Sequence, residues 1–321
     1  MTDIQFALIQ ALQTHATWLE APMLFFSFLG EPELYLLVIA VLYWCWDTRL
    51  GLRLALLMGI SGGLNQALKV AFHLPRPYWV SPEVRAFGSH PSFGLPSAHA
   101  QGSASFWGLL AADARWKWFT VFAIGMAFFI GVSRVVLGVH FPTDVLAGWA
   151  FGVAILLGFL ALEKPVGRRI AALPLSGQVL AAFAGSLALA LASFGALAAL
   201  GDWEVPASWA AGALERSGEP VHPLDILDAI TASGLFFGFA AGAAADRYPG
   251  SMCARGKGSV RLFRYIFGLA VAGVIWYGFG LFVPQDAVLA AYLFQYLRAA
   301  AAGAWVSFGA PAFFARYGPG T

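Results

Sequence analysis

Long apolar stretches alternate with short polar connections along almost the whole chain. Several apolar runs approach about 20 residues, the length that an α-helix needs to cross the hydrocarbon core of a bilayer. Gly, Pro and charged residues gather between these runs, where helices are expected to end. The pattern predicts spans over residues 33–47, 50–72, 96–110, 117–137, 141–162, 174–200, 225–245, 263–283 and 287–314. The predicted fold class is therefore an all-α, polytopic transmembrane helical bundle.

Other segments depart from this pattern. Residues 4–19 place leucines on one side of a short helix and glutamines elsewhere, which is too polar for a comfortable span. An interfacial helix and an ordinary packing helix are both open for this segment. Residues 73–95 are rich in Pro and Gly and predict a structured loop. In one of the later spans, Gly234, Gly238 and Gly242 recur every four residues, which predicts the close approach of a neighbouring helix.

Composition supports a membrane protein. The 321 residues are 60% hydrophobic and 11% charged, with a mean hydropathy of +0.72, whereas soluble domains carry about 25% charged residues. Cys45 and Cys253 have neither a disulfide framework nor metal-ligand spacing. With Asp3 and no basic region before an apolar core, no cleavable signal peptide is expected. We expect membrane lipids as partners and no nucleic acid; a homo-oligomer is left open.

The sequence SRVVLGVHFPTD, from Ser133 to Asp144, carries the most informative chemistry. If His140 opens a helix, Asp144 lies one turn later on the same face and can hydrogen-bond the imidazole. Such a carboxylate orients a catalytic histidine and stabilises its charged form. Arg134 adds a planar cation that can bind a phosphate through two parallel hydrogen bonds. This combination predicts phosphate chemistry.

Two upstream segments strengthen the phosphate hypothesis. KVAFHLPRP has six residues between Lys69 and Arg76, and LPSAHA places Ser97 two residues before His99. A helix that begins near Ser97 would put His99 in its first turn. The free backbone N–H groups of a helix N-terminus themselves favour an anion.

These three segments resemble the signature motifs of the type 2 phosphatidic acid phosphatase superfamily: K-x6-RP, PSGH and SR-x5-H-x3-D. Their order and spacing agree, and the resemblance covers residues 33–162, about 40% of the chain. Ala98 stands where the family has Gly; its backbone N–H survives, but a conformation that only Gly adopts easily would not. The implied organisation is short N-terminal helices in 1–32, a phosphatase core in 33–162 and extra C-terminal spans in 163–321.

The resemblance also implies a mechanism that needs neither metal nor cofactor. His140 would attack phosphorus to form a phosphohistidine, with Asp144 orienting it, and His99 would protonate the leaving oxygen. The phosphate oxygens would be bound by Lys69, Arg76, Ser97, the Ala98 backbone N–H and Arg134. Apart from the loop residue Glu83, Asp144 is the only acid expected near these positions.

The expected substrate is amphiphilic, because a site between apolar helices admits a lipid tail while its phosphate meets water. Candidates are phosphatidate, phosphatidylglycerol phosphate, a sphingoid-base phosphate and a polyprenyl phosphate or diphosphate. Two alternatives are a lipid phosphotransferase with an acceptor pocket in 163–321 and a non-enzymatic lipid carrier. Vanadate-dependent haloperoxidases resemble the same motifs but are soluble proteins.

The distribution of charge predicts which side of the membrane the site faces. The connections opposite the motifs are basic, with Arg49, Arg53, Arg115, Lys117, Lys164, Arg168, Arg169, Arg247, Arg255, Lys257 and Arg261. The motif side carries Arg85 and a mostly acidic loop with Asp202, Glu204, Glu215, Arg216 and Glu219. Basic loops face the cytoplasm, so the site is expected on the extracytoplasmic side of the inner or plasma membrane.

Five other polar residues are assigned separately. His15, His73, His90 and His222 match no motif position and are expected to be loop residues, with a headgroup contact left open for His73. Arg298 lies well inside the last predicted span, where a charge is costly. It is expected to pair with Asp225 or Asp228, or to line a polar cavity.

Overall fold

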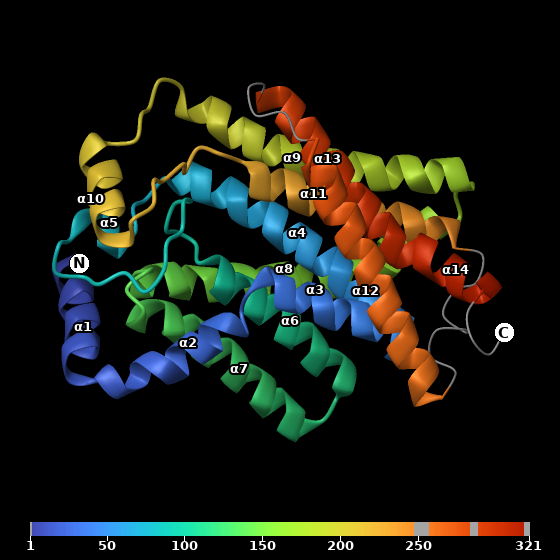
Figure 1. Cartoon of the computed structure of the whole chain (residues 1–321), viewed down its shortest axis with the longest axis horizontal. Helices are drawn as coiled ribbons and strands as arrows, with labels where there is room; N and C mark the ends of the chain where they lie inside the picture. The colour runs from blue at the N-terminus through green and yellow to red at the C-terminus, as the bar shows by residue number, and fades with distance from the viewer. Residues whose placement is uncertain (1, 247–256, 283–287, 318–321) are drawn as a thin grey trace. The chain divides into compact units, whose positions relative to one another are not determined.

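The computed structural model describes residues 2–246, 257–282 and 288–317, and every regular element within them is a helix (Figure 1). The first eight helices are α1 (Thr2–His15), α2 (Glu20–Phe28), α3 (Pro32–Val41), α4 (Thr48–Phe72), α5 (Pro77–Val80), α6 (Ala98–Ala114), α7 (Lys117–Val136) and α8 (Pro142–Ala171). They are followed by α9 (Leu175–Leu200), α10 (Ala207–Ser217), α11 (Leu227–Ala245), α12 (Gly258–Gly280), α13 (Val288–Ala304) and α14 (Ala310–Tyr317). A 3-10 turn covers Thr17–Leu19, and π-helical turns cover Leu42–Trp46 and Trp305–Gly309.

Six of these helical segments are long and apolar enough to cross a membrane: Thr48–Val80, Lys117–Val136, Pro142–Ala171, Leu175–Leu200, Leu227–Ala245 and Gly258–Gly280. A seventh arises if Thr17–Phe28 and Pro32–Trp46, which meet at 49°, form one bent span. The predicted polytopic helical fold is thus confirmed. Helix α6 forms where a span was predicted, but its 17 residues make it shorter than these six. Arg247, Cys253 and Arg255 lie outside the described residues.

Two helical segments differ from the prediction. Helix α8 continues nine residues past the expected end at 162, and its last turn contains Arg168 and Arg169. Basic side chains there interact favourably with the negative end of the helix dipole, which offsets the polarity of the segment. Helix α10 was not predicted, because its 11 residues are too short and too polar to stand out as an apolar run. Its Ala213 is fully buried in a core that also contains Trp79.

The chain forms two compact units, each discontinuous in sequence. The first unit combines residues 1–34, 64–157 and 192–226, and the second combines 35–63, 158–191 and 227–321. Helices α3, α4, α8 and α9 each belong partly to one unit and partly to the other. All predicted site residues lie in the first unit.

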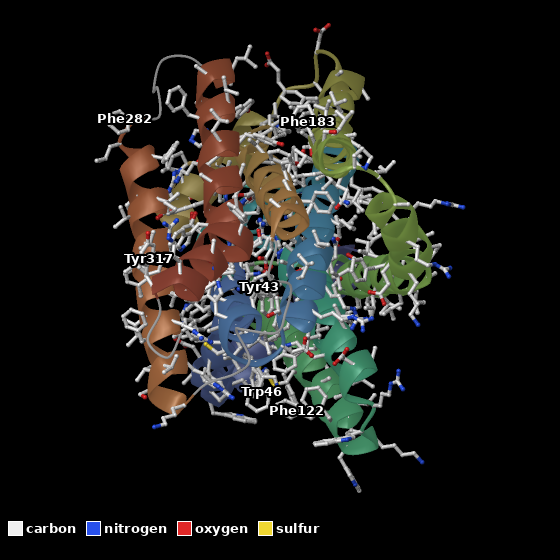
Figure 2. All side chains as sticks on the ribbon, turned by 90° about the vertical axis from the view of Figure 1, so that its right-hand side faces the viewer. Tyr43, Trp46, Phe122, Phe183, Phe282 and Tyr317 are labelled. Atoms are coloured by element: carbon white, nitrogen blue, oxygen red, sulfur yellow. The ribbon has the colours of Figure 1, made fainter. Side chains whose placement is uncertain are left out.

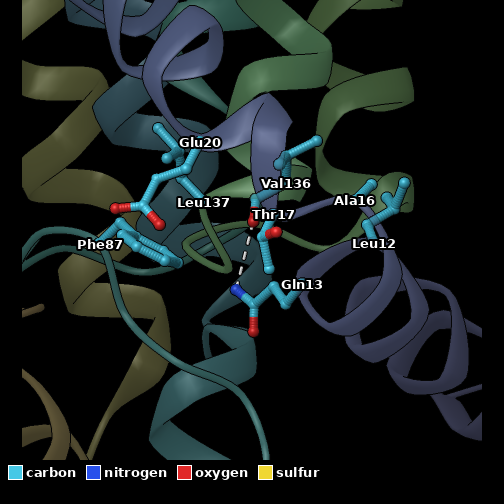
Figure 3. Close-up of a pocket in the computed structure, with 8 residues that line it drawn as sticks. All are labelled: Leu12, Gln13, Ala16, Thr17, Glu20, Phe87, Val136 and Leu137. Atoms are coloured by element: carbon cyan, nitrogen blue, oxygen red, sulfur yellow. Dashed lines mark hydrogen bonds between the residues drawn. The ribbon is translucent and has the colours of Figure 1, made fainter.

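Helix α1 anchors the segment around the third motif in the first unit. Ile9 is buried in the core, so α1 packs against the protein along this side. The Oε1 atom of Gln5 accepts hydrogen bonds from the backbone N (3.1 Å) and the hydroxyl (2.9 Å) of Thr143 at the start of α8. Gln13 donates to the carbonyl of Val136 at the end of α7 (3.2 Å), and both residues line a pocket (Figure 3). Both ends of the third motif are therefore held by the N-terminal helix.

In the second unit, α11 and α13 run against each other (Figure 1). A Cβ placed on Gly234 would lie 2.6 Å from the carbonyl oxygen of Tyr296 and 2.8 Å from the Cβ of Ala299. Gly238 and Gly242 make equally close approaches to α13 and the π-helical turn after it. The predicted close approach through the recurring glycines is confirmed, since no side chain fits between the two backbones.

Buried polar atoms of the second unit pair with backbone carbonyls. The hydroxyl of Tyr43 donates to the carbonyl of Ser307 (3.0 Å), and the indole of Trp44 donates to that of Val306 (2.9 Å). Tyr43 lies among the helices, whereas Phe282 projects outward at the end of α12 (Figure 2). Such outward apolar side chains suit a surface that faces lipid.

Candidate active site

The two cations of the first motif are buried and bind the loop that precedes α6. Lys69, in the last turn of α4, donates a hydrogen bond from its ammonium group to the carbonyl of Phe93. Arg76, just before α5, donates from Nε to the carbonyl of Ser92 (2.7 Å) and from Nη1 to that of Val139 (2.9 Å). Both side chains are therefore fixed in position by backbone oxygens of the loops that carry the other motifs.

The second motif lies at the start of α6, as predicted. Ser97 is fully buried, and its backbone N donates to the carbonyl of Asp144 (3.0 Å). Its Oγ has no hydrogen-bond partner within the described residues. Ala98 is the first residue of α6 and does not have a positive φ, so Ala replaces Gly here without backbone strain. His99 follows in the first turn.

The third motif pairs its histidine and aspartate. The sequence suggested that His140 opens a helix. In the structure it lies in the turn that precedes α8, which begins at Pro142. The pair still forms: His140 Nδ1 lies 3.2 Å from Asp144 Oδ2, which also accepts the backbone N–H of Phe141 at 2.9 Å. The non-helical turn at His140 and the first turn of α8 thus bring the imidazole and the carboxylate together, as a continuous helix was expected to do.

The hydrogen bonds of His140 define its tautomer. Nη1 of Arg76 lies 3.0 Å from His140 Nε2, and a guanidinium can only donate. Nε2 is therefore the acceptor, and Nδ1 carries the proton that is donated to Asp144. Burial, together with the charges of Arg76, Lys69 and Arg134, holds the pKa of His140 well below its usual value of 6.5. The structure thus presents a neutral imidazole whose Nε2 lone pair accepts a hydrogen bond from Arg76.

Arg134 lies in the last turn of α7 and is almost fully buried. Its guanidinium donates to the hydroxyl of Ser27 and to Nε2 of His90, while its Nε has no partner within the described residues. His90 lies in a loop, as predicted, but it contacts this site cation. Burial and the charges of Arg76 and Arg134 hold the pKa of His90 well below 6.5, so the ring accepts the hydrogen bond in neutral form.

A second acid also lies in the cluster. Oε1 of Glu31, in the short break between α2 and α3, lies 3.2 Å from Nε2 of His99. The expectation that Asp144 is the only nearby acid apart from Glu83 is therefore wrong. Glu83 instead accepts a hydrogen bond from Gln10 of α1. No spacing relative to the three motifs distinguishes Glu31, Ser27 or His90, because they come from an upstream turn and an irregular loop.

Two glycines allow the motif segments to meet. A Cβ on Gly148 of α8 would lie 2.7 Å from the carbonyl oxygen of Ser97 and 2.8 Å from the Cβ of Ala100. A Cβ on Gly94 would lie 2.8 Å from the carbonyl oxygen of Pro75 and 3.0 Å from Oδ2 of Asp144. A larger residue at either position would push α8 or the loop away from the site.

The remaining polar residues have local partners. The Nδ1 atom of His73 lies 3.1 Å from the carbonyl of Ala71, and its ring lies beside Trp203 with centroids 5.1 Å apart. His15 ends α1 rather than lying in a loop, and His222 is a loop residue. In the second unit, Arg298 donates to Gln295 (3.2 Å) and lies 3.9 Å from the ring centroid of Trp276, rather than bonding Asp225 or Asp228.

Two protein-family profiles match the chain. Residues 50–167 match the PAP2 superfamily, and this match contains every predicted site residue. Residues 230–321 match the PAP2 superfamily phosphatase transmembrane extension, which accounts for most of the added C-terminal helices.

Individual relatives point to the same family. Phosphatidylglycerophosphatase B of Bacillus subtilis (strain 168) is 31% identical over 164 residues, which cover 47% of this chain and 78% of that protein. Glucose-6-phosphatase 3 of Bos taurus is 29% identical over 189 residues, which cover 51% of this chain and 54% of that protein. The chain therefore spans only about half the length of this second relative.

Among solved structures, the crystal structure of the first transmembrane PAP2 type phosphatidylglycerolphosphate phosphatase from Bacillus subtilis matches with a TM-score of 0.43 and 26% identity. This match covers 51% of this chain and 87% of that one. With the family profiles and the relatives together, the chain belongs to the PAP2 superfamily and is a multi-pass integral membrane protein. The resemblance seen in the three motifs is confirmed.

Proposed function

We propose that this protein is an integral-membrane, metal-independent phosphatase that hydrolyses a lipid phosphate through a phosphohistidine intermediate. The observation that carries the proposal is the geometry around His140. Its neutral Nε2 faces Arg76, in a cluster that also contains Lys69 and Arg134. Two buried donors of the same cluster, Ser97 Oγ and Arg134 Nε, have no partner within the described residues. Buried donors of this kind are normally satisfied, and phosphate oxygens would satisfy them.

In the first step, the lone pair of His140 Nε2 attacks phosphorus. The bond from phosphorus to the leaving oxygen breaks, and His99 donates a proton to that oxygen. In the second step, water attacks the phosphohistidine, His99 accepts a proton from the water, and the phosphorus–nitrogen bond breaks. Inorganic phosphate and neutral His140 result, so both steps balance.

Asp144 has a defined part in this sequence. Once Nε2 bonds to phosphorus, the His140 ring becomes cationic, and the carboxylate beside Nδ1 stabilises that charge. Lys69, Arg76 and Arg134 stabilise the negative charge on the phosphate oxygens, as metal ions do in other phosphoryl-transfer enzymes. The arrangement therefore needs no metal ion.

The surroundings of the site favour an amphiphilic substrate. Leu146, two residues after Asp144, is 60% exposed, and α7 and α8 carry further exposed apolar side chains. A lipid tail can lie along such a surface while its phosphate enters the polar cluster. Phosphatidylglycerophosphatase B is named for a lipid phosphate, whereas glucose-6-phosphatase 3 is named for a sugar phosphate. The basic loops listed above support a site on the extracytoplasmic side of the membrane.

Phosphate release tests the proposal. The full chain in detergent with EDTA is offered phosphatidate, phosphatidylglycerol phosphate, a sphingoid-base phosphate, a polyprenyl diphosphate and glucose 6-phosphate, beside His140→Ala. We expect release from at least one lipid substrate by the wild type and none by the variant. Equal release by the variant would overturn the role of His140. No release from any substrate by the wild type would overturn hydrolysis and lead to the same assay with hydroxyl acceptors.

A further inference from the structure

Two carboxylates hold the two site histidines through opposite ring nitrogens. Asp144 contacts His140 at Nδ1, which leaves Nε2 for phosphorus. Glu31 contacts His99 at Nε2, so any proton that His99 transfers to a substrate must leave from Nδ1. In both pairs a carboxylate contacts one ring nitrogen and leaves the other for the reaction, but the two nitrogens exchange roles. Glu31 belongs to none of the three motifs.

The charges around His99 explain why an acid is needed there. Burial and the charges of Arg134 and Arg76 lower the pKa of His99 to about 4, whereas the hydrogen bond and the charge of Glu31 act to raise it. The ring of His90 lies beside that of His99, with centroids 6.3 Å apart. A proton donor must nevertheless be protonated before it acts. Glu31 is the acid that contacts this ring in the part of the chain that the structure describes.

The chain positions Glu31 through a tight break between α2 and α3. The backbone N of Gly30 donates to the carbonyl of Ser27 (2.9 Å), and that of Glu31 donates to Phe28 (3.1 Å). A Cβ on Gly30 would lie 2.8 Å from Cδ2 of His99, so the break rests directly on the imidazole. Ser27, in the last turn of α2, accepts a hydrogen bond from Arg134. The end of α2 and the break after it therefore contribute two side chains to the site.

We propose that Glu31 is a positioning residue that favours the protonated form of His99 and directs its Nδ1–H toward the leaving oxygen. This inference rests on the proposed function. When the phosphorus–oxygen bond breaks, the proton passes from Nδ1 to that oxygen, and the neutral ring keeps its Nε2–H on Glu31. Proton transfer from the attacking water returns Nδ1 to its protonated state. The carboxylate stays ionised throughout; its side chain is 38% exposed, against 2% for Asp144.

The test compares two leaving groups in the same protein preparation. A single-chain alkyl phosphate must have its alcohol protonated as it leaves, whereas p-nitrophenyl phosphate releases a stable phenolate. For Glu31→Gln we expect kcat on the alkyl phosphate to fall about 10- to 100-fold, with kcat on p-nitrophenyl phosphate unchanged within about twofold. KM should stay the same for both substrates. Glu33→Gln, which changes an exposed acid two residues away on α3, should leave both rates at wild-type values.

Further readouts separate positioning from a structural role. The ratio of the two rates does not depend on how much of the protein is folded, so it stays informative for an unstable variant. Glu31→Asp should recover part of the loss, and the alkaline limb of kcat should move to lower pH in Glu31→Gln, because protonated His99 loses its partner. Equal losses on both substrates, or no loss on the alkyl phosphate, would overturn the inference. A wild type inactive on both substrates would instead overturn the proposed function.

Discussion

The motif cluster of the first unit and the α11–α13 contact of the second unit differ in how they treat buried polar atoms. Around α13, the hydroxyl of Tyr43 and the indole of Trp44 bond to backbone carbonyls, and glycines bring the helices together. In the motif cluster, cations and imidazoles face one another, and Ser97 Oγ has no partner in the described residues. Such an arrangement is costly for stability and is retained where it serves a function. Substitutions in the two regions should therefore have opposite effects on stability and turnover.

The largest expected effect is that of Arg134→Ala in the motif cluster. Removing the cation deprives the phosphate of a bidentate partner and leaves Ser27 and His90 without their donor. We expect turnover of the substrate identified above to fall at least about 1,000-fold, as for arginines that stabilise a transferred phosphoryl group. The thermal midpoint should change little, and a variant that kept a tenth of wild-type turnover would contradict the assignment.

A smaller loss is expected for Asp144→Asn. The amide keeps the shape of the side chain but no longer stabilises the positive charge on His140 during the reaction. We expect kcat to fall about 100-fold, so that more activity remains than in His140→Ala. Measuring both variants side by side checks the order, and equal residual rates would mean that Asp144 does more than orient the ring.

In the second unit, Gly238→Leu should affect stability and spare chemistry. The new side chain would meet the carbonyl of Ala300 and force α11 away from α13. We expect a loss of about 1–3 kcal/mol in the free energy of unfolding, with kcat per folded molecule within about twofold of wild type. Gly273→Leu on α12, where an added Cβ meets nothing within 4 Å, is the matched control. A large fall in kcat for Gly238→Leu alone would show that the two regions are not independent.

The smallest expected effect is that of mild acid on the rate. A histidine with the ordinary pKa of 6.5 would lose about threefold in its neutral fraction between pH 7 and pH 6. Because the pKa of His140 is lowered, its nucleophilic form persists as the pH falls through this range. We therefore expect no fall in kcat/KM between pH 7 and pH 6, and a threefold or larger fall would argue that the His140 imidazole titrates normally.

The sequence predicted the parts of this molecule that local rules determine. Apolar runs located the long helices, and the motif spacings placed Lys69 and Ser97 at helix ends, whereas His140 lies in the turn before α8 rather than at the start of a helix. Glu31 and His90 were not assigned to the site, because their contacts depend on how a break and a loop pack against α6 and α7. Long-range packing of this kind leaves no periodic signal in one sequence.

Arg298 illustrates the same limit in the second unit. The cost of a charge within a span predicted a polar partner, and a partner is present. It is the neighbouring Gln295 together with the face of Trp276, and not one of the acids expected from charge alone. Cation–π contacts have no sequence spacing when the two residues lie on different helices.

Helix α8 is long enough that its two ends are expected on opposite sides of the membrane. Its 30 residues correspond to about 45 Å of helix, which exceeds a hydrocarbon core of about 30 Å. Asp144 lies in its first turn and Arg168 and Arg169 in its last. A labelling experiment on the basic end of this one helix would therefore report the side on which the chemistry takes place, without any substrate.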